Sequence, residues 1–334
     1  MNASGPTNMK VSIIICTRNR ADSLRLTLAS IGHAIVPQGW DVELLLVDNG
    51  STDNTRLVAE KSRLPNTALR YLLEARKGKC HGLNTGIENA SGSVLLFTDD
   101  DVRVPPGWIE GMCGPIFDGT FDAAGGRVRL ADSLVRSWHT PVIKTWLVSG
   151  IPSVGDLWGA NMAFHRNVLG AVPGYDVQLG PGALGLCDDT LFASQLCDAG
   201  FKLGTIDVEV EHHPDVARLT EPDLVKAAIR RGRSFAYCAY HWDRKPERFT
   251  VPREMLLRAK RAMRLLVAPR ELDPPRMWRI FYTWHISYLQ KYRSLQSSPR
   301  IYSKRGLATG NSEVCRAEPH AQPGRANGGR SEED

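Results

Sequence analysis

Val11-Ser-Ile-Ile-Ile-Cys16 is an almost unbroken run of apolar residues, and the polar turn Thr17-Arg-Asn-Arg20 follows it. A run of this kind is typical of a strand buried on both faces of a parallel sheet, because both sets of alternating side chains face apolar neighbours. After the turn, Leu24, Leu28 and Ile31 recur at helical spacing. The stretch therefore predicts a buried strand that leads through a polar turn into an amphipathic helix.

The same pattern of strand, polar turn and helix repeats along the chain. Further strands are predicted at residues 42–47, 69–73 and 94–97, with a helix that Asp53 caps and another at residues 80–90. Alternating strands and helices predict an α/β fold with a doubly wound, mostly parallel sheet and flanking helices. Another helix is predicted from Asp188 to Ala199, and residues 220–296 are predicted to be helical. The fold class is therefore α/β with a helical C-terminal region.

Polar residues stand at the carboxyl ends of the predicted strands, at Thr17, Asp48 and Asp99. In open α/β sheets this edge is where ligands bind. Residues far apart in the sequence are therefore expected to share one site.

The strongest chemical feature is Thr98-Asp-Asp-Asp-Val102, which directly follows a predicted strand. Consecutive carboxylates repel one another, so a fold that keeps them at a strand end often supplies a cation. Carboxylate oxygens suit Mg²⁺ or Mn²⁺, with water and substrate phosphates completing the coordination. The alternative is an acidic turn that caps a helix.

The order of these motifs resembles that of family 2 glycosyltransferases, which have the GT-A fold. The resemblance covers residues 9–235 and rests on an ordered series that is more specific than any one motif. The series is Thr17-Arg-Asn-Arg20, Val47-Asp-Asn-Gly-Ser-Thr-Asp53, Asn84-Thr-Gly-Ile87, Ala90-Ser-Gly92, the acidic triplet, Trp158-Gly-Ala-Asn-Met-Ala163, Gly174-Tyr-Asp176, Cys187-Asp-Asp-Thr-Leu191 and Ala199-Gly-Phe201.

The resemblance implies roles for the residues at the strand ends. Thr17 and Asp48 would line the base pocket, where Asp48 would accept a hydrogen bond from N3–H of uracil or thymine. An Asx-turn is the alternative for Asp48. Asp99 would lie near the ribose and Asp101 on the metal ion, with Asp100 in support.

Asp188 and Asp189 match the position where the family usually carries Glu-Asp at a helix start. The resemblance implies that Asp189 is the general base that deprotonates the acceptor hydroxyl. Adjacent carboxylates near a diphosphate should raise the pKa of one of them, which suits a base. The change from Glu-Asp to Asp-Asp keeps Asp188 as a second candidate, and simple helix capping is the alternative.

The segment Glu211-His-His-Pro-Asp-Val-Ala-Arg-Leu-Thr220 matches a family segment in which a His contacts the metal or diphosphate. His212 is the predicted ligand and His213 the alternative, against a surface His pair. Arg218 is expected to neutralise the diphosphate. Lys79 is interpreted as part of an exposed basic loop that could also reach the donor.

The complete predicted site has three groups of residues. The catalytic residues are Asp189 and Asp188, and the metal ligands are Asp101 and His212. Donor binding is assigned to Thr17, Arg18, Asp48, Asn84, Asp99, Asp100 and Asn161, where Asn161 has a structural turn as its alternative.

These motifs predict an inverting glycosyltransferase that depends on Mn²⁺ or Mg²⁺. It would move a sugar from a UDP or dTDP donor to a hydroxyl of a cell-surface glycan or a lipid-linked precursor. A sugar-phosphate nucleotidyltransferase and a non-catalytic nucleotide-sugar-binding protein are the alternatives. A dehydrogenase is disfavoured because no Gly-x-Gly-x-x-Gly follows the first strand.

Charge divides the chain. Residues 1–217 carry 18 basic and 24 acidic residues, whereas residues 218–305 carry 21 and 7, a net charge of +14. Residues 253–292 combine basic residues with apolar and aromatic residues at helical spacing, which fits a helix in a membrane interface. The alternative is a helical appendage that packs on the catalytic domain with its charges in water. No nucleic-acid-binding module accompanies the charge, so no nucleic acid partner is expected.

Composition predicts the location and the boundaries. The 7 cysteines are scattered without a Cys-x-x-Cys pair, which predicts reduced thiols in a cytoplasmic protein with no structural zinc. No secretory signal or membrane-spanning run is expected, and any membrane contact would be peripheral, on the inner face. The predicted units are a nucleotide-sugar-binding half (9–125), an acceptor-binding half with the base (126–217), a basic helical region (218–296) and a disordered tail (297–334).

Overall fold

The first half of the protein is a parallel sheet with helices between its strands. The computed structural model describes residues 9–139, 141–153, 155–248, 250–267 and 277–302. Neighbouring strands pair in parallel in the spatial order β3-β2-β1-β4, so their carboxyl ends share one edge. The strands are β1 (Met9–Thr17), β2 (Trp40–Asp48), β3 (Ala68–Leu73) and β4 (Val94–Thr98). The helices are α1 (Ala21–Gly32), α2 (Thr55–Lys61) and α3 (Lys79–Asn89).

The second half extends this sheet with strands of mixed direction. The order continues β4-β7-β6-β8-β5, where β7 is antiparallel to both β4 and β6, and β5 is antiparallel to β8. These strands are β5 (Val102–Arg103), β6 (Ala123–Leu130), β7 (Asn161–His165) and β8 (Leu203–His212). The helices are α4 (Trp108–Phe117), α5 (Pro141–Trp146) and α6 (Asp188–Asp198). The predicted mostly parallel α/β sheet is confirmed. Its parallel strands β1 to β4 are the four strands that the sequence pattern predicted.

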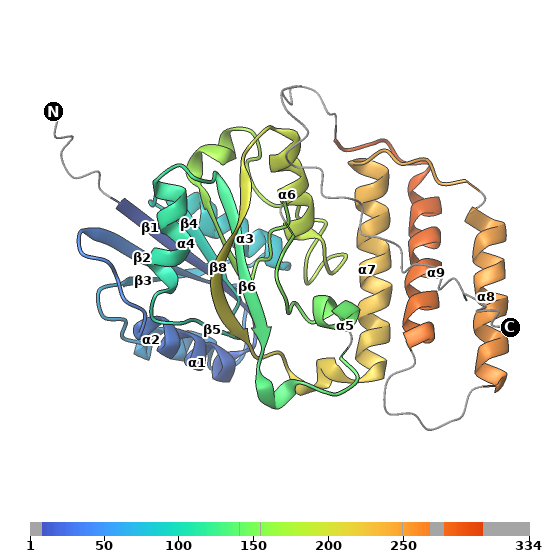
Figure 1. The fold of residues 1–334 in the computed structure, drawn as a ribbon, viewed down its shortest axis with the longest axis horizontal. Helices are drawn as coiled ribbons and strands as arrows, with labels where there is room; N and C mark the ends of the chain where they lie inside the picture. The colour runs from blue at the N-terminus through green and yellow to red at the C-terminus, as the bar shows by residue number, and fades with distance from the viewer. Residues whose placement is uncertain (1–8, 140, 154, 249, 268–276, 303–334) are drawn as a thin grey trace, which may run out of the picture.

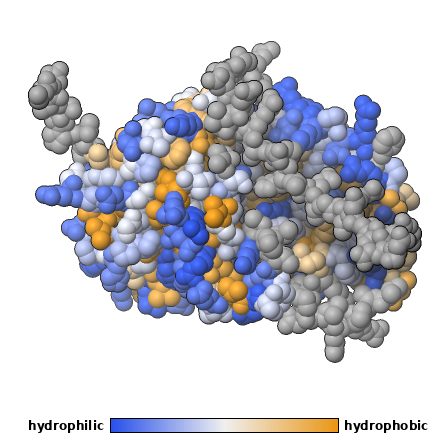
Figure 2. Space-filling view, in the orientation of Figure 1, coloured by the Kyte–Doolittle hydropathy of each residue, from blue (hydrophilic) through white to orange (hydrophobic). Residues whose placement is uncertain are grey.

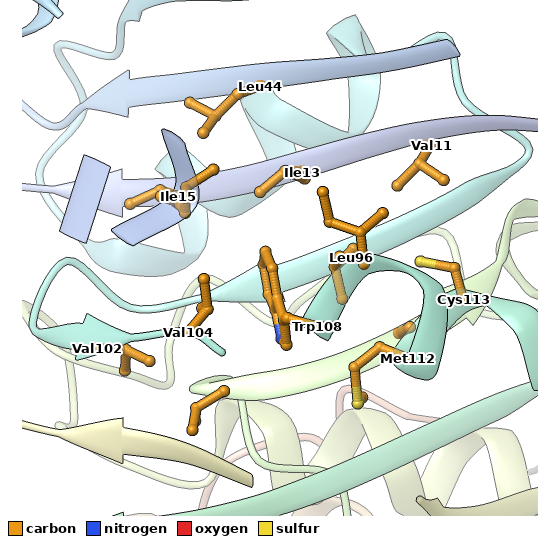
Figure 3. Packing of buried hydrophobic residues seen from close by; sticks show 14 of the residues in the cluster. Val11, Ile13, Ile15, Leu44, Leu96, Val102, Val104, Trp108, Met112 and Cys113 are labelled. Carbon is orange, nitrogen blue, oxygen red and sulfur yellow. The ribbon is translucent and has the colours of Figure 1, made fainter. Parts of the chain in front are cut away.

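Both faces of the sheet are buried, which explains the unbroken apolar runs. Val11, Ile13 and Ile15 belong to one core with α1 and α4, where Trp108 is fully buried (Figure 3). Ile14 and Cys16 point to the other face and pack with residues of α3 and α6. Alternate side chains of one strand therefore enter two separate cores, and apolar residues are needed at every position.

Two loops at the carboxyl edge are tied together by short hydrogen bonds. The Asp53 carboxylate accepts the backbone N–H of Ala21 and of Thr55, both at 3.0 Å, so it serves the first turns of α1 and α2 together. Asn19 Oδ1 accepts the backbone N–H of Thr52 at 2.7 Å, and the Asn19 N–H donates to Ser51 Oγ at 2.8 Å. Asn54, not the predicted Asp53, is the N-cap residue of α2, and Asp53 binds the first turns of both helices from just outside them.

Three C-terminal helices form a layer beside the sheet, in the order α7, α9, α8 from the sheet outward (Figure 1). They are α7 (Glu221–His241), α8 (Thr250–Val267) and α9 (Met277–Leu295). Close packing of α7 on α9 requires Gly232, because a Cβ there would lie 2.4 Å from the carbonyl oxygen of Trp284. None of the described helices is long and apolar enough to span a bilayer.

The described chain extends past the predicted start of the disordered tail at residue 297. The Tyr302 hydroxyl donates to Asp176 Oδ2 at 2.5 Å, and the Ile301 N–H donates to His241 Nδ1 at 3.2 Å. Residues 297–302 therefore pack on the protein, and the predicted boundary is too early. The rest of the predicted tail, residues 303–334, lies outside the described residues.

Candidate active site

The acidic triplet forms the turn between β4 and β5, at the carboxyl edge of the sheet. Asp100 and Asp101 are 7% and 2% exposed. Thr17 Oγ1, at the end of β1, donates to Asp100 Oδ2 at 2.7 Å. Arg20 reaches both carboxylates, with Nε 3.2 Å from Asp100 Oδ1 and Nη2 2.7 Å from Asp101 Oδ2. The first strand end and the triplet therefore form one polar cluster.

His212, at the end of β8, faces the other oxygen of Asp101. Its Nδ1 lies 2.8 Å from the backbone carbonyl of Leu147, and a carbonyl only accepts, so Nδ1 carries the proton. Its Nε2 lies 3.5 Å from Asp101 Oδ1. A proton on Nε2 lets His212 donate to Asp101, and without that proton Nε2 offers a metal ion a lone pair next to a carboxylate oxygen.

Asp100 and Asp101 are held in different charge states. Burial raises the pKa of Asp100 to about 7, despite the nearby Arg20. Burial also disfavours the charged form of Asp101, but His212, Arg20 and Arg218 outweigh burial and lower the pKa of Asp101. Asp101 is therefore the carboxylate that stays ionised in this pair, as a metal ligand must.

Lys79, at the start of α3, connects the triplet to the rest of the site. Its ammonium group makes a short ion pair with Asp99 Oδ1. Burial disfavours its charge, but Asp99 and Asp188 outweigh burial and raise the pKa of Lys79. A side chain only 20% exposed corrects the interpretation of Lys79 as part of an exposed loop.

Asp188 and Asp189 occupy the first turn of α6. Asp189 Oδ2 accepts the backbone N–H of Gly159 at 3.2 Å, and Oδ1 accepts that of Thr190 at 2.8 Å. Burial raises the pKa of Asp189. Burial and the charge of Asp189 raise the pKa of Asp188 to about 7. The pair thus holds a carboxyl that exchanges its proton near neutral pH, as a general base does.

The two acidic groups meet around Lys79. A Cβ on Gly159 would lie 3.8 Å from Lys79 Nζ, and the Gly159 N–H is the group that binds Asp189. Lys79 also pairs with Asp99. The structure therefore brings the triplet and the Asp188-Asp189 pair into one site.

Residues 12–170 match the family model for glycosyl transferase family 2. This part of the chain is therefore similar to glycosyltransferase family 2. The match covers the parallel half of the sheet, the triplet and β7, and it ends before Asp188 and His212.

Curated relatives match this chain over part of their own length. Glycosyltransferase AglE of Haloferax volcanii is 34% identical over 119 residues, which is 35% of this chain and 39% of that protein. Dolichol-phosphate mannosyltransferase of Pyrococcus furiosus is 32% identical over 149 residues, which is 44% of this chain and 40% of that protein. An undecaprenyl-phosphate 4-deoxy-4-formamido-L-arabinose transferase of Photorhabdus laumondii is 27% identical over 49% of this chain and 51% of that protein. The chain spans about half the length of these relatives or less.

Solved structures agree on the GT-A fold. The mannosyltransferase PcManGT of Pyrobaculum calidifontis, in complex with GDP-Man and Mn²⁺, superposes with a TM-score of 0.58 at 20% identity, covering 87% of this chain and 88% of that one. TarS of S. aureus, residues 1–349, gives a TM-score of 0.50 at 17% identity, covering 87% of this chain and 91% of that one.

Asp48 is buried at the end of β2 with a partner on each oxygen. Its Oδ1 accepts the Ser51 N–H at 2.7 Å, which is the turn contact considered as the alternative to base binding. Its Oδ2 accepts the Tyr71 hydroxyl at 2.8 Å. The turn contact is present, and the contact with a base remains a prediction.

Two amides predicted to bind the donor have structural partners instead. Asn161 is fully buried: its Oδ1 accepts Trp108 Nε1 at 2.9 Å, and its Nδ2 donates to the carbonyls of Arg127 and Val208. Its hydrogen-bonding capacity is spent inside the core, so the assignment to donor binding is wrong. Asn84 binds the backbone N–H and carbonyl of Tyr175, at 2.8 and 2.9 Å, and we assign it to positioning that loop.

The remaining predicted residues differ in their distance from the cluster. Arg218 lies at its rim, with Nη1 3.6 Å from Asp101 Oδ2. His213 is turned to Glu211, at 2.6 Å, so His212 is the better candidate of the two. Arg18 is exposed, and its assignment to donor binding stays a prediction.

Arg20 is the main residue that the sequence analysis did not assign. It pairs with both Asp100 and Asp101. The available signal was its place in Thr17-Arg-Asn-Arg20, a polar turn at the same sheet edge as the triplet. Asn19 has a positive φ of 52°, and this turn geometry decides which of the two arginines points inward.

The described residues contain no ready-made metal cage. They include no group of three or more His, Cys, Asp or Glu side chains arranged to hold an ion. Asp101 and His212 still provide a carboxylate oxygen and an imidazole lone pair on one side. Mg²⁺ and Mn²⁺ commonly take the rest of their coordination from water and substrate phosphates, so this pair fits such an ion.

Proposed function

We propose that this chain transfers a sugar from a nucleoside diphosphate to an acceptor hydroxyl with inversion at the anomeric carbon. The observation that carries the proposal is the meeting of two acidic groups around Lys79. One group contains the carboxylate and imidazole pair suited to a cation. The other contains carboxyls with raised pKa values at a helix start. An inverting transfer needs both, one for the leaving diphosphate and one for the acceptor proton.

The diphosphate would bind beside Asp101, His212, Arg20 and Arg218. A divalent ion held there by Asp101 and His212 would neutralise charge on the departing diphosphate. The two arginines now contact Asp101 Oδ2, at 2.7 and 3.6 Å, and each carries further N–H donors for phosphate oxygens. Asp101, His212 and these arginines are thus the proposed leaving-group side of the site.

Asp189 is the proposed general base. Two backbone N–H groups, from Gly159 and Thr190, fix the orientation of its carboxylate. The ammonium of Lys79 lies beside Gly159, where it favours the ionised form of Asp189. Asp189 then takes the proton while the acceptor oxygen attacks the anomeric carbon from the side opposite the diphosphate.

We propose a lipid-linked acceptor, which the names of the relatives support. Dolichol-phosphate mannosyltransferase and undecaprenyl-phosphate arabinose-derivative transferases handle polyprenyl phosphates by name. For the donor we propose UDP or dTDP, recognised at Asp48. The structural neighbour with GDP-Man makes GDP the comparison that an experiment needs.

The test is a thermal-shift panel of UDP-, dTDP- and GDP-sugars with and without Mn²⁺, followed by a transfer assay with the stabilising donor. We expect one nucleotide to raise the Tm by several degrees only with metal, and Asp101→Asn to abolish this metal-dependent shift. The transfer assay detects nucleoside diphosphate released in the presence of a polyprenyl-linked acceptor.

The same experiment separates the rival functions. A nucleotidyltransferase would release pyrophosphate from a nucleoside triphosphate and a sugar phosphate. A non-catalytic binder would show the thermal shift without any product from the acceptors tested. Either result would refute the proposed transfer.

A further inference from the structure

Helix α8 attaches to the protein through polar contacts. The Glu254 carboxylate accepts Gln290 Nε2 and Arg293 Nη1 of α9, both at 2.9 Å. Glu254 is 6% exposed, and Leu257 and Arg261, at the following helical turns, are half-buried. The inward side of α8 is therefore centred on a buried ionic contact.

The opposite side of α8 is apolar and exposed. At 3.6 residues per turn, residues 255, 259, 262, 263 and 266 fall on the side away from Glu254 and Arg261. The exposed fractions of Met255, Met263 and Leu266 are 66%, 62% and 87%. A helix that only completes the fold would direct these side chains inward. In α8 the usual orientation of an amphipathic helix is reversed.

Basic residues flank this outward face. Arg253, Lys260 and Arg264 project on one side of it and Arg258 on the other, and all four are exposed. Figure 2 shows hydrophobic and hydrophilic atoms side by side at the right-hand edge of the molecule, where Figure 1 places α8. Glu254 is the acidic residue within α8, and it is buried against α9. Arg253 and Arg258 pair with Glu247 and Glu254, and the Arg264 guanidinium lies over Tyr282, so the positive charge beside the apolar face comes chiefly from Lys260 and Arg264.

Most aromatic residues of α9 are less exposed than this face, with Phe281, at 43%, as the exception. Ile280, Ile286 and Leu289 are buried, and Tyr288 stacks between Trp284 and Tyr292. Because α9 lies between α7 and α8, most of its apolar surface is covered (Figure 1). The membrane interpretation of residues 253–292 therefore narrows to α8.

We propose that α8 docks on an anionic lipid surface, lying in its plane with the outward apolar face among the acyl chains. Exposed methionine and leucine side chains supply the apolar contact, and the flanking arginine and lysine residues pair with lipid phosphates. This surface lies on the outermost helix and not in the active site, so the inference goes beyond the proposed transfer and does not depend on it. Charge complementarity favours lipid over a second copy of this chain, whose matching face would carry the same positive charge. The apolar centre of the face favours lipid over nucleic acid.

The test is co-sedimentation of the full chain with phosphatidylglycerol vesicles and with phosphatidylcholine vesicles at low and high salt. We expect binding to phosphatidylglycerol that weakens with salt. We expect a fall of at least tenfold in the partition coefficient for the triple variant Met255→Ser/Met263→Ser/Leu266→Ser. The variant lacks the three apolar side chains that would be buried among the acyl chains. Lys260→Gln/Arg264→Gln should weaken binding severalfold.

The matched control removes two positive charges elsewhere. Lys61 and Arg63 are exposed at the end of α2, and Lys61→Gln/Arg63→Gln should leave vesicle binding unchanged. Circular dichroism checks that each variant folds. The proposal is overturned if wild type does not bind phosphatidylglycerol, or if the triple variant binds as well as wild type. It is also overturned if light scattering shows that the outward face makes a dimer that the triple variant loses while vesicle binding persists.

Discussion

Buried carboxylates lie toward both ends of the parallel strands, but the protein treats them in opposite ways. Glu43, toward the amino-terminal ends, accepts hydrogen bonds from the Ser12 hydroxyl and from the N–H and hydroxyl of Ser91, and it pairs with Arg70. Burial alone would raise its pKa, but the hydrogen bonds from Ser91 and Ser12 outweigh burial and lower the pKa of Glu43 to about 2. At the carboxyl edge, burial raises the pKa of Asp100 and of Asp188 to about 7.

The difference separates a structural charge from a functional one. At Glu43 the fold supplies enough donors to stabilise the charge, so the carboxylate strengthens the folded state. Around Asp100 and Asp188 the fold packs carboxylates together with too few hydrogen-bond donors and cations to offset their negative charge. Each of these carboxylates therefore takes up a proton more readily. An uncompensated buried charge destabilises a protein unless a proton, cation or ligand offsets it. The imbalance is therefore consistent with the cation and diphosphate site proposed at this edge of the sheet.

The largest effect is expected from Asp189→Asn, which removes the proposed base. The transfer rate should fall by about 100- to 10,000-fold, the usual range for loss of general-base catalysis, while donor binding is kept. Single-turnover kinetics with a hydroxyl acceptor measures the rate, and thermal shift with the donor measures binding. A loss of less than about threefold would indicate that the attacking oxygen is already ionised, as in a phosphate acceptor, and would remove Asp189 from this role.

The next effect is on stability, at the other end of the strands. Glu43→Gln should lower the free energy of unfolding by about 2 kcal/mol, because charged hydrogen bonds to buried donors are lost. Glu43 has a folded pKa below its ordinary value of 4.5, so its contribution is present above that pH and is lost as the pH falls toward about 2. Urea titrations at pH 7 and pH 3 measure both effects.

The matched control for Glu43 is Glu60, which pairs with Arg56 at 2.8 Å on the surface of α2. Both side chains of that pair are more than half exposed, so Glu60→Gln should change stability by less than about 0.5 kcal/mol. Equal losses in the two variants would contradict the assignment of Glu43 as a buried structural charge.

A smaller effect of opposite sign is expected from Asp188→Asn. The folded protein holds the Asp188 proton up to about pH 7, whereas the unfolded chain releases it near its ordinary pKa of 3.8. Stability therefore falls as the pH rises between these values, and Asn removes the cost. The variant should be more stable than wild type at pH 8, and by less at pH 5. Destabilisation at pH 8 would show that the Asp188 charge is compensated.

The smallest effect is expected from Lys79→Met, read from the pH dependence of transfer. The charge of Lys79 lowers the pKa values of Asp188 and Asp189, so its loss raises both. The acidic limb of the pH–rate profile should move to higher pH by about half a unit to one unit. Lys79→Arg should restore the profile, whereas a purely structural role would lower the rate at every pH.

The sequence predicted the four parallel strands and the acidic residues at their carboxyl ends, but not the strands β5 to β8. Strand β1 was predicted at residues 11–16 and spans Met9–Thr17, because a strand buried on both faces needs an apolar side chain at almost every position. Carboxylates at the ends of the strands also indicated where the site lies. Parallel strands bring their carboxyl ends to one edge, so Thr17, the triplet and Asp48 had to lie near one another.

The direction of single polar side chains could not be predicted. Asn161 and Asn84 lie in segments typical of the family, yet their amides hold the core and a loop, because an amide serves a backbone group as well as it serves a ligand. Lys79 and Arg20 point inward because of turns whose geometry the composition does not fix. The outward orientation of the apolar side of α8 could not be predicted either. Helical spacing shows which side of a helix is apolar, but not whether that side faces the protein or the solvent.

The hydrogen bonds that join the loops after β1 and β2 have a consequence for how the site opens. Asp53 holds the first turns of α1 and α2, and Asn19 is bonded to Ser51 and Thr52. The two loops below the proposed nucleotide site should therefore move as one rigid unit, which has its final shape before the donor binds. Little ordering entropy is then lost there on binding. Any closure over a donor bound as proposed would then have to come from another part of the site, such as the segment of Trp158 and Gly159, whose N–H holds Asp189.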